Sequence, residues 1–223
     1  MIIKNRVKNS FFIWKIRCFI SLKITGNNKF KLKGKKNEIN CSQALLKNTK
    51  ILINGSNNSI KINNQCRFEG SISIFGDNNV LIISENCTIK KAEFWLEDKN
   101  NNIFIGKDTT IENNTEFAAI EGCKILIGDD CMLSSDIAIR TGDSHSILNM
   151  EGIRINTSKD IVIGTHVWIG NKVVITKGAK ILNNSIIGSG ALVNKVFDSS
   201  NCILAGVPAK IIKEKINWKR ERI

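Results

Sequence analysis

The feature that most constrains the fold of this 223-residue chain is a six-residue repeat between Lys159 and Lys195. In every sextet the fourth residue is a β-branched aliphatic, and the residue two places before it is small or aliphatic. A strand repeats every two residues and a helix every 3.6 residues, so a period of six fits neither alone. It indicates short strands separated by corners, which wind around one aliphatic core as a parallel β-helix.

The same register extends towards the N-terminus if three sextets form each coil. All of the predicted inward positions are apolar, although only 42% of the chain is hydrophobic, so chance placement does not explain the pattern. The eighteen positions are Ile62, Phe68, Ile74, Ile83, Ile89, Trp95, Ile105, Ile111, Phe117, Ile127, Leu133, Ile139, Ile163, Ile169, Ile175, Ile181, Ile187 and Val193.

The extra residues between coils all fall at one corner of the predicted prism. The short insertions are turn-forming segments such as Gly55–Asn58, because Gly and Asn accept a positive φ at low cost. The long insertion has eighteen residues, Arg140–Thr157, and predicts a protruding loop over about 140–158. Loops of this length without structure of their own are usually functional.

The ends of the chain are less regular. Residues up to about Trp14 have a helical apolar stripe, and residues 16–24 alternate like a strand, so we expect a short basic amphipathic helix and then a strand. The segment Ile211–Ile223 has a helix-like pattern. These patterns predict an N-terminal cap over residues 1–24, a solenoid over 25–197, and a C-terminal segment with a helix over 198–223.

Charge is concentrated at the two ends. Residues 1–36 hold eleven Lys and Arg and no acid, whereas the solenoid body is nearly neutral. Nucleic-acid binding usually needs a basic face with interleaved aromatics, so we expect the basic ends to meet anionic lipid, anionic glycan or phosphate instead. The N-terminal segment could cap the open end of the solenoid or make an interfacial membrane contact. No apolar run is long enough to span a membrane, and no secretory signal is recognised.

Three of the seven cysteines form a predicted column. Cys66, Cys87 and Cys131 each precede an inward residue by two places, and Thr109 takes the same place in the coil between them. We expect buried, reduced thiols that pack in the core, because no Cys-x-x-Cys pair supports a metal site. Reduced thiols favour a cytoplasmic location.

Three motifs together resemble the left-handed β-helix hexapeptide acyltransferases over about residues 50–213. They are Ile161–Gly170, which contains Trp-Ile-Gly; Ile187–Ala191, which contains Gly-Ser-Gly-Ala; and Ala205–Lys210, which contains Val-Pro-Ala-Lys. The segment around His145 is similar to the histidine loop of polysaccharide and sialic acid O-acetyltransferases. The resemblance implies left-handed coils, a homotrimer with active sites between subunits, acetyl-CoA as the acetyl donor, and a glycan acceptor. The six-residue period itself leaves the handedness open.

Histidine suits the role of general base for an alcohol near neutral pH, so His145 is the candidate base. Asp143 could orient its imidazole or could only form a turn with its own backbone. Trp168 is expected to face outward, where it could line the thioester pocket near the developing oxyanion or pack in the trimer. His166 is expected at a coil corner as a surface or turn residue. The candidates for binding the donor are Trp168, Gly170, Gly188, Ser189, Gly190, Ala191, Lys195 and Lys210.

Alternative functions remain open at this point. N-acetylation of an amino sugar nucleotide is one, although such enzymes often add a βαβ domain that has no G-x-G-x-x-G motif here. A non-catalytic, lectin-like solenoid is another. Serine acetyltransferases have a larger helical N-terminal domain, and the γ-type carbonic anhydrases use three histidines on zinc, whereas this chain has two. The basic ends favour an anionic acceptor, with direct attack of its hydroxyl on the thioester.

Overall fold

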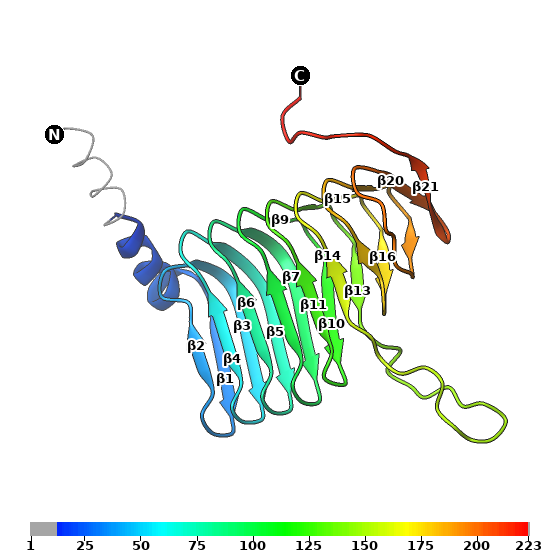
Figure 1. Ribbon diagram of the computed structural model, residues 1–223. Coiled ribbons are helices and arrows are strands. Elements are labelled where there is room, and N and C mark those ends of the chain that lie inside the picture. The colour runs from blue at the N-terminus through cyan, green and yellow to red at the C-terminus, as the bar shows by residue number, and fades with distance from the viewer. Residues whose placement is uncertain (1–12, 223) are drawn as a thin grey trace.

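The chain winds into a three-sided parallel β-solenoid in the computed structural model, which describes residues 13–222 (Figure 1). Each strand pairs in parallel with the equivalent strand of the next coil, as Phe68 does with Ile89 and Ile125 with Ile161. The all-β solenoid predicted from the repeat is therefore confirmed. Its left-handed winding stays a prediction from the resemblance.

Two sheets make the three faces of the prism. The first face consists of β2 (Glu38–Asn40), β4 (Ser59–Ile62), β6 (Val80–Ile83), β8 (Asn102–Ile105), β11 (Lys124–Ile127), β14 (Ile161–Ile163) and β17 (Lys180–Ile181). The long strands β3 (Leu45–Asn54), β5 (Arg67–Phe75) and β7 (Thr88–Glu97) bend across the second and third faces. The second face continues with β9 (Thr110–Ile111), β12 (Met132–Leu133), β15 (Trp168–Ile169), β18 (Ile186–Ile187), β20 (Ile203–Gly206) and β21 (Ala209–Lys213). The third continues with β1 (Lys29–Lys33), β10 (Glu116–Ile120), β13 (Ala138–Arg140), β16 (Val174–Thr176) and β19 (Leu192–Val193).

The core follows the predicted register at seventeen of the eighteen positions, which are all buried. Trp95 is the exception, because its side chain is 39% exposed and lies against Phe75 on the outside. The bend in β7 contains one more residue than the bend in β5, where the pairing shifts between Phe68 and Gly70. This shift turns Phe94 and Leu96 inward in place of Trp95, so the strict period of six was wrong at this bend.

Adjacent aromatic residues in β7 give a direct test of this register. We expect Phe94→Ala to lower the free energy of unfolding by about 3–5 kcal/mol, because Phe94 is buried and its ring stacks on Phe117 at 4.7 Å between centroids. Trp95→Ala should cost much less, since its ring is partly in water. Chemical denaturation of both variants compares them. A larger loss from Trp95→Ala would contradict the observed register.

A ladder of buried asparagines holds the edge between the third and first faces. The Oδ1 atom of Asn58 accepts from the backbone N–H of Asn79 at 2.9 Å, and Oδ1 of Asn79 accepts from that of Asn101 at 3.0 Å. The ladder ends where Oδ1 of Asn101 accepts from the N–H of Cys123. The turn-forming insertions seen in the sequence thus supply side-chain amides that satisfy backbone donors at this edge.

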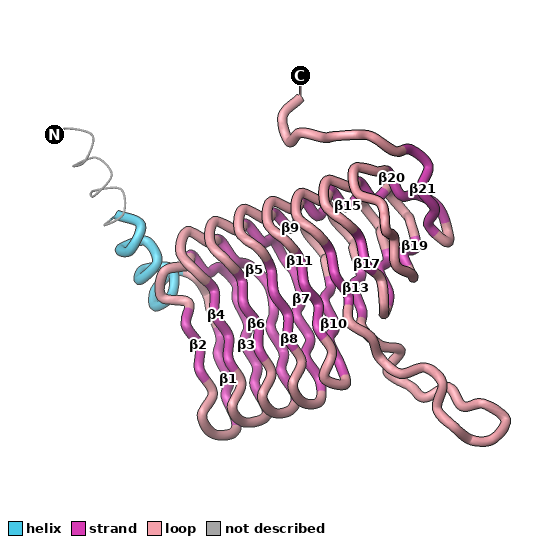
Figure 2. Tube along the Cα trace, viewed as in Figure 1, coloured by secondary structure: helices cyan, strands magenta, loops and turns pink. Residues whose placement is uncertain are grey.

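The N-terminal end carries a helix rather than the expected strand. Residues 13–20 are helical and continue into a π-helical turn, η1 (Ser21–Thr25), at the open end of the first coil (Figure 2). Cys18 is buried, Leu22 packs against the core, and the indole N–H of Trp14 donates to the Gln43 carbonyl at 2.9 Å. The strand prediction for residues 16–24 was wrong because the end of the core selects a one-sided helical stripe. Most of the helix predicted up to Trp14 lies outside the described residues.

The C-terminal helix expected over 211–223 is also not formed in the described part of the chain. β21 pairs antiparallel with β20 up to Lys213, and residues 214–222 then run back along the solenoid without helical turns. Trp218 and Arg220, two residues apart, both contact the solenoid, which an extended chain allows and a helix would not. Tertiary contacts therefore override the helix-like pattern.

The cysteine column is confirmed as a buried feature. Cys66, Cys87, Thr109 and Cys131 are all within 1% of full burial, and all seven cysteines are buried and unpaired. Burial raises the pKa of the Cys131 thiol to about 12, so this thiol stays protonated at neutral pH. Among residues 13–222, no helix has the length and apolarity needed to cross a bilayer.

Candidate functional site

The long insertion forms a loop, residues 141–160, that leaves the prism between β13 and β14 (Figure 1). It emerges at the edge between the third and first faces, where the asparagine ladder has ended. The loop doubles back on itself, with the N–H of Ile155 donating to the carbonyl of Ile147 at 2.9 Å and a bridge between Leu148 and Arg154. His145 lies in the outgoing arm of this loop.

The carboxamide of Asn156 holds the two arms of the loop together. Its Nδ2 donates to Oδ2 of Asp143 at 2.8 Å and to the backbone carbonyl of His145 at 2.7 Å. Its Oδ1 accepts from the N–H of Ile147 at 2.7 Å. Because Asn156 is only 7% exposed, these bonds are shielded from water and fix the backbone on both sides of His145.

Asp143 is held by the scaffold rather than by His145. Its Oδ2 accepts from Nζ of Lys177, which follows β16, and the same ammonium group donates to the carbonyl of Asn156 at 3.0 Å. Hydrogen bonds from Lys177 and Asn156 lower the pKa of the Asp143 carboxyl. No hydrogen bond within residues 13–222 joins this carboxylate to the His145 imidazole, and an orienting role for Asp143 stays a prediction. The carboxylate is instead paired with Lys177 at the base of the loop.

Glu121 anchors the returning arm of the loop. It pairs with Arg154 at 2.7 Å, and it accepts hydrogen bonds from the hydroxyl of Ser158 at 2.8 Å and from the N–H of the same residue at 3.2 Å. The hydrogen bond from Arg154, followed by those from Ser158, lowers the pKa of this carboxyl. The loop is therefore tied to the prism by ionised carboxylates at both arms.

These two carboxylates make the anchoring of the loop pH-dependent. A carboxyl whose folded pKa is depressed stabilises the fold above its ordinary pKa, about 4, and this contribution is lost as the pH falls through the folded value. We expect amide protection factors in residues 141–160, corrected for intrinsic exchange rates, to be high at pH 7 and to fall below about pH 4. Lys177→Met should lower them already at pH 7. Equal protection at pH 7 and pH 3 would contradict this anchoring.

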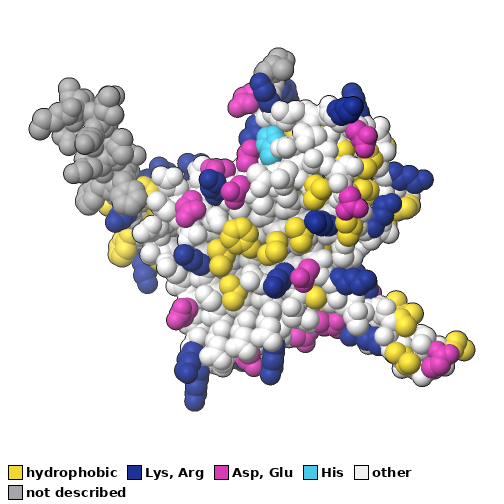
Figure 3. All heavy atoms as spheres, viewed as in Figure 1, with side chains coloured by type: hydrophobic (Ala, Val, Ile, Leu, Met, Phe, Trp, Pro, Cys, Tyr) yellow, Lys and Arg dark blue, Asp and Glu magenta, His cyan; other side chains and the backbone are white. Residues whose placement is uncertain are grey.

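The His145 side chain is exposed. Figure 3 shows apolar side chains, with an acidic one, on the protruding end of the loop. Met150 is 98% exposed, an unusual environment for a long apolar side chain. The other exposed apolar side chains of the loop are Ile147, Leu148, Ile153 and Ile155. The loop thus presents its histidine together with an uncovered apolar surface.

Trp168 lies in β15 on the second face, between the inward side chains of Val167 and Ile169. Its indole faces outward and is 38% exposed, as the register predicts. The loop leaves from the edge between the third and first faces, which is opposite the second face in a three-sided prism. His145 and Trp168 of one chain are therefore on opposite sides of the solenoid.

A row of small residues runs beside Trp168 on the second face. The pairings Leu133 to Ile169 and Ile169 to Ile187 place the residues that follow them, Ser134, Gly170 and Gly188, in one row. A Cβ at Gly170 would lie 2.7 Å from the backbone nitrogen of Ser189, so glycine is required there by close coil packing.

The remaining candidates for binding the donor are distributed differently. Ser189 and Gly190 are exposed at the corner after β18, and Gly190 has a φ of 71° that favours glycine. Ala191 is buried in the core, so only its backbone could reach a ligand. Lys195 lies over the ring of Phe197, with Nζ 5.3 Å from the centroid, and Lys210 is exposed in β21.

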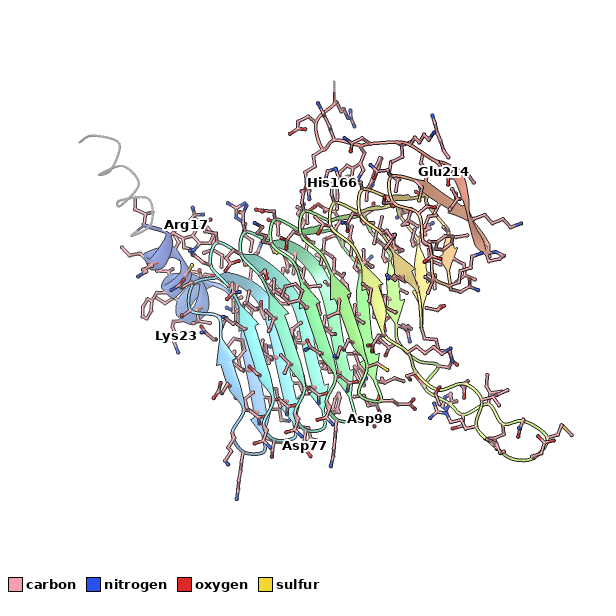
Figure 4. All side chains as sticks on the ribbon, viewed as in Figure 1. Arg17, Lys23, Asp77, Asp98, His166 and Glu214 are labelled. Carbon is pink, nitrogen blue, oxygen red and sulfur yellow. The ribbon has the colours of Figure 1, made fainter. Side chains whose placement is uncertain are left out.

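His166 sits at the corner before β15 with a φ of 56°, as expected for a corner residue, but it is half-buried rather than free on the surface. Its Nδ1 lies 2.6 Å from Oδ2 of Asp130, and its Nε2 lies 3.1 Å from the carbonyl oxygen of Trp218. Figure 4 shows His166 at the edge along which the C-terminal segment returns. Within residues 13–222, no group of three or more His, Cys, Asp or Glu side chains is arranged to hold a metal ion.

Comparisons with known proteins agree with the solenoid fold. Residues 160–195 match the family model described as bacterial transferase hexapeptide (six repeats). A solved structure of the polysialic acid O-acetyltransferase OatWY superimposes with a TM-score of 0.84 and 38% identity, covering 88% of this chain and 92% of that one. The polySia-specific acetyltransferase NeuO superimposes with a TM-score of 0.79 and 35% identity, covering 87% of this chain and 90% of that one. This chain belongs to the hexapeptide-repeat acetyltransferases.

Similarity to curated relatives extends over part of their length. The polysialic acid O-acetyltransferase of Escherichia coli O1:K1 / APEC is 39% identical over 123 residues, which are 55% of this chain and 39% of that protein. The matched region thus spans well under half of this relative. Within the hexapeptide-repeat acetyltransferase fold, the structure adds three residues that sequence reasoning missed.

These missed residues are Asn156, Lys177 and Trp218. Asn156 lies inside the long insertion, and Lys177 follows a strand of the next coil, so neither belongs to a motif. Their shared signal is weak, because an Asn or a Lys near a loop is common. Trp218 could have been suspected from the sequence as a single large aromatic in an otherwise charged C-terminal segment.

Proposed function

We propose that this chain transfers an acetyl group from acetyl-CoA to a hydroxyl group of an anionic cell-surface glycan. Support comes from the two solved relatives, whose names place them among polysialic acid O-acetyltransferases. The basic N-terminal segment, with eleven Lys and Arg in residues 1–36, adds electrostatic attraction for an anionic acceptor. Seven unpaired thiols support a cytoplasmic location.

The observation that carries the intersubunit part of the proposal is the separation of His145 and Trp168 on opposite sides of one solenoid. A site that uses both residues needs two copies of the chain, with the loop of one copy reaching the second face of the next. The exposed apolar side chains of the loop, such as Met150, supply a surface for such a contact. We therefore include a homotrimer with intersubunit sites in the proposal.

In this mechanism the imidazole of His145 accepts the proton of the acceptor hydroxyl while the hydroxyl oxygen attacks the thioester carbonyl carbon. The C–O bond forms, the carbonyl oxygen gains negative charge, and collapse breaks the C–S bond. The protonated His145 then returns its proton to the departing thiolate. Trp168 lines the pocket with its indole N–H near the developing oxyanion, and the chain itself forms no covalent intermediate.

The small-residue row beside Trp168 offers backbone close to the surface for the extended donor. Gly170 and Gly188 lie in this row, and Ser189, Gly190 and the backbone of Ala191 lie at its corner. Lys195 and Lys210 supply positive charge for the phosphates of the donor. Asp143, through Lys177 and Asn156, positions the loop rather than the imidazole itself.

The test follows thiol release from acetyl-CoA with a panel of acceptors: a sialic acid polymer, a neutral polysaccharide, an amino sugar nucleotide, and no acceptor. We expect the fastest release with the sialic acid polymer and a product that mild base cleaves, as an ester is cleaved. A base-stable product formed from the amino sugar nucleotide would support N-acetylation instead. If no acceptor accelerates thiol release and acetyl-CoA does not bind, the chain is a non-catalytic solenoid and the proposal is wrong.

A further inference from the structure

The C-terminal segment returns to the solenoid next to Trp168. After β21 it first exchanges hydrogen bonds with Asn201, whose carbonyl accepts from the N–H of Ile216 at 2.9 Å and whose Nδ2 donates to the Ile216 carbonyl at 3.1 Å. The segment then runs along the edge between the first and second faces (Figures 1 and 4). This path brings Trp218 back to a strand that lies fifty residues earlier in the chain.

Trp218 fills the angle between two aromatic side chains. Its ring stacks on His166 with 4.0 Å between centroids and 10° between planes, and it lies tilted against Trp168 at 6.0 Å. The indole N–H of Trp218 donates to the carbonyl of His166 at 3.0 Å, while Nε2 of His166 lies 3.1 Å from the carbonyl oxygen of Trp218. Trp218 is only 6% exposed, so its side chain is held on several sides.

Arg220 locks the segment in place two residues later. Its Nε donates to Oδ1 of Asp130 at 2.9 Å, and its other nitrogens donate to the hydroxyl of Thr110 and to the carbonyls of Asp108 and Cys131. The second carboxylate oxygen of Asp130 faces His166. One carboxylate therefore ties the arginine of the segment to the histidine that Trp218 covers.

The charge of Asp130 is preserved by these contacts. Burial raises the pKa of its carboxyl, but the hydrogen bonds and charges of His166 and Arg220 outweigh burial, and the pKa is lowered overall. The carboxylate is thus ionised at neutral pH, as a bond to Arg220 requires.

The geometry points to Trp218 as a positioning residue that sets the orientation of the Trp168 indole in the acyl-transfer site. Trp168 leaves the strand with one side towards solvent and the other towards Trp218, and the tilted ring contact limits the rotamers open to it. A pocket wall built from an otherwise exposed indole needs such support to hold a fixed geometry. This inference rests on the proposed role of Trp168.

The test is a double-variant cycle in the full-length chain with acetyl-CoA and the best glycan acceptor. We expect Trp218→Ala to lower kcat about tenfold or more with a smaller change in the KM for the acceptor, because a misplaced wall harms the transition state more than binding. Trp218→Phe should restore most of the rate, since a phenyl ring can still pack against Trp168. Lys219→Ala, at an exposed neighbouring position, is the matched control and should retain full rate.

The decisive comparison is made in the Trp168→Ala background. There, Trp218→Ala should cause no further loss of kcat if Trp218 acts through Trp168. If the two substitutions instead lower kcat independently, so that their fold-losses multiply, the inference is overturned. The indole N–H resonance of Trp168 supplies a readout that needs no activity, and it should shift in Trp218→Ala but not in Lys219→Ala. An unmoved resonance would overturn the positioning role. Full activity of Trp168→Ala together with a shifted resonance would instead refute the proposed function of Trp168 and leave the positioning contact standing.

Discussion

Replacing His145 with alanine is expected to lower kcat about 10²- to 10⁴-fold, the usual contribution of a general base. An acceptor hydroxyl is a poor nucleophile near neutral pH, and His145 is the histidine presented to solvent on the loop. The KM for acetyl-CoA should change little, since none of the candidates for binding the donor lies on the loop that carries His145. Thiol release measured at saturating donor with the best acceptor gives the comparison.

Two further variants control for damage to the fold. Ser146→Ala changes the exposed neighbour of His145 and should retain full rate. His166→Ala should lower the melting temperature, because it removes the contacts to Asp130 and Trp218, whereas His145→Ala should not. A His145→Ala protein with undiminished rate on the best acceptor would refute the assigned mechanism.

Mixing two impaired variants should restore activity. His145→Ala and Trp168→Ala damage different halves of the site, and each half comes from a different copy of the chain in the proposed assembly. Random reassembly of equal amounts into trimers should give intact sites at about a quarter of the positions, since an intact site needs the right variant on each side. Thiol release after mild dissociation and remixing measures the recovery.

The controls for this experiment are built into the mixture. Each variant remixed with itself should keep its own low rate, and remixing wild-type chains should show that the procedure preserves activity. If the site formed within one chain, no mixture of the two variants would recover. An inactive mixture with an intact trimer on sizing would therefore contradict the intersubunit site, even if both residues are needed.

Much of the fold follows from local periodicity. A repeat of six predicts inward positions because each coil meets only its neighbours and repeats the same environment, as seen at Ile163, Ile169 and Ile175. Trp95 breaks the prediction because the bend of β7 holds an extra residue. Periodicity cannot detect this residue, because Phe94 and Leu96 on either side of Trp95 are apolar and suit an inward position equally well. The secondary-structure predictions for the two ends of the chain were wrong for a related reason. Contacts with the solenoid, at Cys18 and at Trp218, decide there between a helix and an extended chain.

The candidate site was predictable where its residues belong to motifs and unpredictable where they join distant segments. The outward direction of Trp168 follows from its place between two inward residues. The partner of Asp143 cannot be predicted in this way, because Lys177 lies thirty-four residues later and comes close to Asp143 only through the winding of the next coil. The contacts of His166 are similar, since its partner Trp218 lies fifty-two residues later in the chain.

The solenoid is built from two kinds of coil. On the N-terminal side, β3, β5 and β7 are nine or ten residues long and bend across two faces, whereas β15, β18 and β19 have two residues each. Long ladders resist local opening better than short ones divided by corners. Local opening is therefore expected to begin in the coils that carry Trp168. The C-terminal segment, which packs on these coils, stabilises them against it. The N-terminal half of the solenoid is then expected to be the more rigid part, and the C-terminal half, which carries Trp168, the part that can adjust to substrates.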